Sequence, residues 1–138
     1  MNYYLKYAIS NITFATPIEE VKEVARPKNI SKRKREKNLL GFIDLRKKKV
    51  PLYDLPKLLD IQAEEKFEAI ISQIDKKYIG FKVNKVLGII TAEDLLPFPE
   101  LVKPKSYFQG IIKDDDSFVQ VLSFNKIVSG FKLKTRKK

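Results

Sequence analysis

The feature that most constrains how this chain can fold is a segment that occurs twice. Residues 41–59 read GFIDLRKKKVPLYDLPKLL and residues 110–128 read GIIKDDDSFVQVLSFNKIV, an ungapped match at a constant offset of 69. Each copy predicts two apolar strands rich in β-branched and aromatic residues, a polar turn between them and a short helix after them. Self-similarity at a long fixed period indicates an internal duplication, which decides the architecture before any local prediction.

The upstream parts of the two copies also match, at an offset of 65. Hairpins are predicted over residues 3–15 and 67–83, and their turns, Ser10-Asn11 and Asp75-Lys76, coincide in the alignment. Since a lone domain of ~65 residues buries so little surface that it is only marginally stable, the two copies are expected to pack on each other. The prediction is an all-β fold with short helices.

Within the single domain of residues 1–138, subdomain 1 is expected over roughly residues 12–62 and subdomain 2 over roughly residues 63–130. Exchange of the N-terminal strand between them stays open at this stage. A helical turn is expected to end near Gly130, before a basic tail over residues 131–138.

Short helical turns are predicted after the first hairpin of each copy. Thr16 and Glu19 form a capping-box pair around Pro17, and Thr91 is expected to cap a turn in the second copy. Apolar residues at spacing three form one edge per copy: Ile18, Val21 and Val24 in the first, and Val83, Val86 and Ile89 in the second. If the fold brings these edges side by side, they form a groove suited to a partner helix.

The chain contains no Cys and no His. Disulfides, thiol nucleophiles, imidazole bases and the usual zinc sites are therefore excluded. The run Asp114-Asp115-Asp116 is the one candidate metal site, but adjacent acids in a hairpin turn usually face different ways, so no metal or other cofactor is expected. No catalytic residue is predicted, and the absence of a visible signal peptide or of a run of ~20 apolar residues makes the cytoplasm the expected location.

The formal net charge is +11. This charge favours anionic partners, although a lysine-rich sequence can also reflect the base composition of the genome. The loop Ser31 to Asn38, which reads SKRKREKN, either contacts phosphate or acidic protein or only keeps the loop solvated. Residues Lys32–Lys37 and the tail Lys132–Lys138 are the segments expected to touch an anionic membrane surface. A small basic β-barrel that binds nucleic acid is kept as the alternative function, although nucleic acid is not the expected partner.

Glu23 and Arg46 are opposite charges that lie beside apolar positions in the first copy, and Gly88 replaces the acid in the second. Because the second copy lacks the pair, the shared core does not need it, and this difference suggests a functional role for the pair.

Four segments together resemble the CheW-type chemotaxis coupling proteins over nearly the whole chain: residues 13–27, 41–55, 78–90 and 107–128. The resemblance implies two intertwined five-stranded barrels of SH3-like type. It also implies a non-enzymatic adaptor, located at the inner membrane through receptor arrays, that joins the chemoreceptor signalling tip to the regulatory domain of the histidine kinase CheA.

The resemblance places the receptor's helical hairpin in a groove between the barrels, with Val21, Glu23, Val24, Arg46 and Ile89 as the matching receptor-binding residues. Glu23 and Arg46 would form the family's ion pair. The kinase contact is expected on the second barrel, without any residue assigned.

Two positions depart from the family pattern. Lys47 stands where the family usually has glycine, and Asn84 stands where it usually has an acid.

Overall fold

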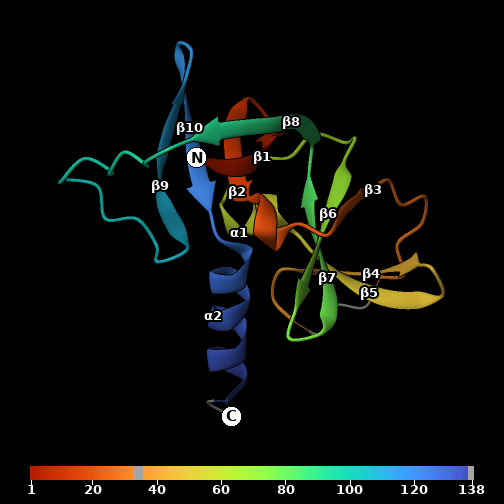
Figure 1. The fold of residues 1–138 in the computed structure, drawn as a ribbon. Helices are drawn as coiled ribbons and strands as arrows, with labels where there is room; N and C mark the ends of the chain where they lie inside the picture. The colour runs from red at the N-terminus through yellow and green to blue at the C-terminus, as the bar shows by residue number, and fades with distance from the viewer. Residues whose placement is uncertain (33–35, 137–138) are drawn as a thin grey trace.

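A computed structural model describes residues 1–32 and 36–136 (Figure 1). Its elements are β1 (Asn2–Ile9), β2 (Ile12–Pro17), the 3-10 turn η1 (Ile18–Glu20), β3 (Glu23–Ala25), β4 (Leu39–Leu45), β5 (Lys48–Tyr53), α1 (Leu55–Leu58), β6 (Glu68–Ile74), β7 (Lys77–Val83), β8 (Lys85–Ala92), β9 (Phe108–Asp114), β10 (Ser117–Leu122) and α2 (Phe124–Arg136). The strands form two five-stranded sheets: sheet A, in the order β8-β1-β2-β10-β9, and sheet B, in the order β3-β6-β7-β5-β4.

The two sheets have the same topology, and each combines strands from both copies of the duplication. Sheet A takes its first hairpin, β1 and β2, from the first copy and its other strands from the second, whereas sheet B takes its hairpin, β6 and β7, from the second. The parallel pairs β2·β10 and β5·β7 hold equivalent places. The predicted fold class, two intertwined five-stranded SH3-like subdomains, is confirmed; the boundary near residue 62 stays a prediction.

The repeated segment has the predicted structure. In the first copy, β4 and β5 form an antiparallel hairpin, and Asp54 caps α1 by accepting a hydrogen bond from the backbone N of Lys57 at 3.4 Å. The hairpin turn places Arg46 at φ +48° and Lys47 at φ +67°, so Lys47, at the position where the resemblance leads us to expect glycine, adopts the left-handed conformation that favours glycine.

The predicted capping box at Thr16 is wrong. Thr16 is fully buried in β2, where its hydroxyl shares a 2.8 Å hydrogen bond with the Tyr7 hydroxyl, and the turn η1 has no side-chain cap. The helical edge from Ile18 to Val24 is also wrong, because the turn ends at Glu20 and Val24 lies in β3. Residues 23–25 pair with the edge of β6 as strand β3 and do not continue the helical turn.

Two further predictions about helices are corrected. Thr91 does not cap a turn, because it lies within β8 and pairs with Tyr3. The C-terminal helix does not end near Gly130 but continues to Arg136, so the predicted basic tail is helical over most of its length. In Figure 1 this helix projects away from the end of β10.

The largest core cluster lies between the two sheets and draws on both copies. Its buried members are Leu5, Tyr7, Ile9, Phe14, Leu55, Ile70, Ile79, Phe81, Val83, Leu122, Phe124, Ile127 and Val128. Phe81 and Phe124 stack at its centre, with their ring centroids 4.2 Å apart. The first turns of α2 are therefore anchored in the core, while separate smaller clusters fill each sheet.

Candidate functional site

Arg46 and Glu23 form a two-point ion pair. The Nη1 atom of Arg46 donates to Oε1 of Glu23 at 3.2 Å, and Nη2 donates to Oε2 of the same carboxylate. Glu23 begins β3 and Arg46 follows β4, and these strands occupy opposite edges of sheet B. The pair therefore links the two edges of the curled sheet, in the fork geometry that fixes direction as well as distance.

The pair is exposed to solvent, with relative side-chain exposures of 64% for Arg46 and 26% for Glu23. The hydrogen bonds from Arg46 are the main reason why the pKa of the Glu23 carboxyl lies below its ordinary value. The same bonds raise the pKa of the Arg46 guanidinium, which stays charged in any case. An exposed pair of this kind adds little to folding stability, and it orders two opposite charges on the surface.

The other three residues predicted to bind receptor lie on the edge strands or just before one of them. Val24 on β3 and Ile89 on β8 are 38% and 61% exposed, and Val21 is partly buried against the core between the sheets. Leu87 on β8, which the sequence analysis did not select, is 44% exposed as well. Edge strand β3 of sheet B and edge strand β8 of sheet A thus both present apolar side chains to solvent, and a partner could cover them.

A buried carboxylate joins β3, an edge strand of sheet B, to β8, an edge strand of sheet A. Glu68 on β6 is 8% exposed; its Oε2 accepts from Nε of Arg26 at 2.6 Å and its Oε1 accepts from the backbone N of Val86 at 2.7 Å. Arg26 directly follows β3 and Val86 lies at the start of β8, so the two strands converge on Glu68. Sequence reasoning missed this residue, although an acid inside a strand of otherwise apolar pattern is a usable signal.

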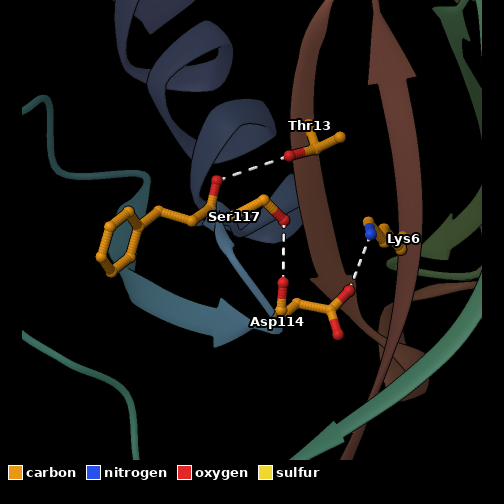
Figure 2. Close-up of polar contacts among 5 residues, drawn as sticks. Lys6, Thr13, Asp114 and Ser117 are labelled. Carbon is orange, nitrogen blue, oxygen red and sulfur yellow. Dashed lines mark hydrogen bonds and ion pairs between the residues drawn. The ribbon is translucent and has the colours of Figure 1, made fainter.

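The acidic turn selected as a candidate metal site has a structural role instead. Figure 2 shows Asp114 at the end of β9, where its Oδ2 lies 2.7 Å from Nζ of Lys6 on β1. The Ser117 hydroxyl donates to the backbone O of Asp114 at 2.9 Å, and the Thr13 hydroxyl donates to the backbone O of Phe118 at 3.4 Å (Figure 2). The contacts of Lys6 and Thr13 connect the N-terminal hairpin to the last hairpin, and the Ser117 bond closes the turn of the last hairpin. Among the described residues there is no group of three acids that could hold a metal ion.

Only part of the two basic segments can be placed. Residues 33–35 of the loop Lys32–Lys37 and residues 137–138 of the tail Lys132–Lys138 lie outside the described residues. Next to the loop, Ser31 forms an isolated bridge with Phe42. No helix in the described part of the chain is long and apolar enough to cross a membrane.

The fold and the exposed edges define an all-β protein of two interlocked SH3-like subdomains that presents ordered charge beside apolar side chains. The family model described as the CheW-like domain matches residues 4–132, and the chain belongs to that family. Among solved structures, the scaffolding protein TtCheW from Thermoanaerobacter tengcongensis is similar, with a TM-score of 0.77 and 25% identity over 88% of each chain. A search of curated proteins gives no match.

Proposed function

We propose that this protein is a non-enzymatic chemotaxis scaffold that couples a chemoreceptor signalling tip to the regulatory domain of the histidine kinase CheA. Membership of the CheW-like family supports the proposal, as does the similarity to a protein described as a scaffold. The observation that carries it is the two-point Glu23–Arg46 pair, which borders exposed Val24 on an edge strand. No bound cofactor is part of the proposal.

The receptor surface consists of Val21, Glu23, Val24, Arg46 and Ile89. An amphipathic helical hairpin would cover the exposed valine and isoleucine with its apolar face, and its polar flank would meet the ordered guanidinium and carboxylate. Glu68 supports this geometry, because it holds the ends of β3 and β8 on one carboxylate. The kinase contact is not assigned to residues.

The first prediction tests this surface. Arg46→Ala removes the fork and leaves Glu23 without its partner, so the affinity for a receptor-tip fragment is expected to fall about tenfold. Isothermal titration measures it. Lys49→Ala is the matched control, because Lys49 lies in the same hairpin and also forms an exposed ion pair, with Asp44 at 2.8 Å, but is outside the proposed surface. The control is expected to bind like wild type.

Two results would contradict the proposal. One is an absence of binding by wild-type protein to both the receptor tip and the kinase regulatory domain at micromolar concentration. The other is an equal loss of receptor affinity in Arg46→Ala and Lys49→Ala, which would show only a dependence on net charge.

The scaffold is also proposed to touch the anionic inner leaflet through residues Lys32–Lys37 and Lys132–Lys138. The support is the net charge of +11 and a helix that carries the backbone of the tail out to Arg136. Each lysine close to an anionic surface contributes on the order of 1 kcal/mol. Flotation with vesicles that contain or lack anionic lipid tests it; equal recovery with both would contradict it.

A further inference from the structure

The parallel ladder between β5 and β7 joins only one end of the two strands. Its partner pairs are Leu52 with Gly80 and Tyr53 with Phe81, whereas β5 begins at Lys48 and β7 at Lys77. Within residues 1–32 and 36–136, the ladder therefore gives residues 48–51 and 77–79 no cross-strand partner along these two facing edges. A strand edge with unpaired N–H and C=O groups is a template for another extended chain, although Pro51 offers only its C=O because proline has no N–H.

A hollow of about 720 Å³ opens at this fork. The segments that line it come from the β4–β5 and β6–β7 hairpins, from the loop before β4 and from helix α2, which lies on the same side as the β6–β7 turn in Figure 1. Its apolar surface is provided by Val50 and Pro51 of β5, Ile79 of β7, and Val128 and Phe131 of α2.

The rim of the hollow is strongly basic. Lys48 and Lys49 come from one hairpin and Lys76 and Lys77 from the other, and Lys49 also pairs with Asp44 at 2.8 Å. Glu36 is the only acidic residue among the described lining residues, and its Oε2 accepts a 2.8 Å hydrogen bond from the Tyr53 hydroxyl. Walls with a clear excess of positive charge concentrate the field in a concave site and favour an anionic occupant.

The aromatic rings of the hollow already have partners. Tyr53 stacks on Phe131 with their centroids 4.7 Å apart, and Nζ of Lys48 lies 5.0 Å from the centroid of the Tyr78 ring. Binding of single-stranded nucleic acid depends on free aromatic faces on which bases can stack. Carboxylates, in contrast, need only the lysine ammonium groups, so the geometry favours an acidic polypeptide over nucleic acid.

We propose that this hollow is a second docking site, which receives an extended acidic segment of a partner protein. The segment lies along the open edge of β5 or β7, where its backbone adds to the sheet, and alternate carboxylates face the lysines of the rim. The site contains none of Val21, Glu23, Val24, Arg46 and Ile89, although Tyr78, which lines it, also interacts with Arg46.

The probe is a fluorescent eight-residue peptide of alternating glutamate and valine, titrated against the full chain at low and moderate salt. Two control peptides accompany it: one has glutamine at every glutamate, and the other is N-methylated at alternate residues so that it cannot pair with a strand edge. The site variant is Lys48→Glu combined with Lys77→Glu. The matched variant, Lys103→Glu with Lys113→Glu, makes the same charge change at two exposed lysines that do not line the hollow.

Saturable binding of the glutamate peptide is expected, with about tenfold weaker binding by the site variant and none of this loss in the matched variant. Both control peptides are expected to bind at least about tenfold more weakly. Circular dichroism verifies that both variants are folded.

Several results would overturn the proposal. No binding to wild type would do so, and so would an equal loss in both variants, which would reflect net charge alone. Tighter site-dependent binding of a single-stranded oligonucleotide or of anionic vesicles would assign the hollow to those ligands instead. Concentration-dependent self-association that the site variant abolishes, measured by sedimentation, would identify a second copy of the chain as the occupant.

Discussion

At the scale of single residues, the Glu23–Arg46 pair gives a direct titration test. Hydrogen bonding to Arg46 lowers the pKa of Glu23 in the folded chain, so Arg46→Gln is expected to raise that pKa toward its ordinary value. Carbon-detected NMR of the side-chain carboxyl measures it. Because the folded pKa is lowered, the pair's contribution to stability is present above the unfolded pKa and is lost as pH falls through the folded pKa.

The stability difference between wild type and Arg46→Gln should therefore be small at neutral pH and shrink further under acidic conditions. Lys49→Gln, which alters a different ion pair of the same hairpin, serves as the control and should leave the Glu23 pKa unchanged. An unchanged pKa in Arg46→Gln would show that the two charges are not paired in solution.

Asn84, one of the two departures from the expected family pattern, uses both ends of its amide. Its Nδ2 donates to the backbone oxygens of Glu64 at 3.2 Å and Lys66 at 3.1 Å, and its Oδ1 accepts from the backbone N of Ser10 at 2.6 Å. A carboxylate can accept the last bond but can donate neither of the first two. The side chain thus holds the turn of the first hairpin against the connection that precedes β6.

Asn84→Asp is accordingly expected to destabilise the fold by about 1–3 kcal/mol at neutral pH, because a buried charge would face two carbonyl oxygens. Urea unfolding at pH 7 measures the change. Asn29→Asp makes the same substitution at an exposed position and should alter stability by less than about 0.5 kcal/mol. Equal effects of both substitutions would show that the amide's hydrogen bonds are unimportant.

At the scale of elements, Gly41 and Gly110 have the same task in the two copies. Their φ angles are +156° and +151°, and a Cβ atom would lie 2.3 Å from the backbone O of Ser31 at the first and 2.9 Å from that of Leu96 at the second. In each copy the chain crosses over the strand there and bridges the next residue, Ser31 with Phe42 and Leu96 with Ile111. The duplication therefore includes a close crossing as well as the apolar skeleton.

Alanine at either glycine is expected to cost about 1–3 kcal/mol, because both the backbone angle and the approaching carbonyl oppose a side chain. Gly130→Ala should have the opposite sign and stabilise by about 0.5–1 kcal/mol, since Gly130 lies within α2 with no atom near its Cβ position. Thermal unfolding of the three variants measures the effects. Unchanged stability of the Gly41 and Gly110 variants would mean that the segments around Ser31 and Leu96 can move away from the added side chain.

The hairpins could be predicted from the sequence because strand alternation and turn residues are local signals. The exchange of the first hairpin depends on which edges meet in space, and the sequence analysis raised it only for one strand and left it open. The prediction of the capping box was wrong for a similar reason. The Thr16 hydroxyl forms its hydrogen bond with Tyr7 on the neighbouring strand β1, and not with the backbone of the following turn. The Glu23–Arg46 pair was selected because Gly88 replaces the acid in the second copy, whereas the two partners of Glu68, Arg26 and Val86, lie 42 and 18 residues away from it in the sequence.

At the scale of the whole molecule, neither half of the chain contains a complete sheet. Residues 1–62 supply the paired hairpins β1·β2 and β4·β5 together with β3, whose partner β6 belongs to the other half. Residues 63–138 supply β6·β7 and β9·β10 together with β8, whose partner is β1. The core between the sheets is likewise drawn from both halves, as the stacking of Phe81 on Phe124 and the contact of Phe124 with Tyr7 show.

Isolated two-stranded hairpins are only marginally stable in water, so residues 1–62 and residues 63–138 are each expected to be unfolded alone. Mixing them should restore the native sheet, because every missing strand partner and the shared core are then present. Circular dichroism and amide NMR of the halves, alone and mixed, test this. The control is a full-length chain with a protease site inserted after exposed Gln62, which should remain folded after cleavage. A dispersed, native-like spectrum from either half alone would show that the subdomains fold independently and that the exchange of strands is not what holds the molecule together.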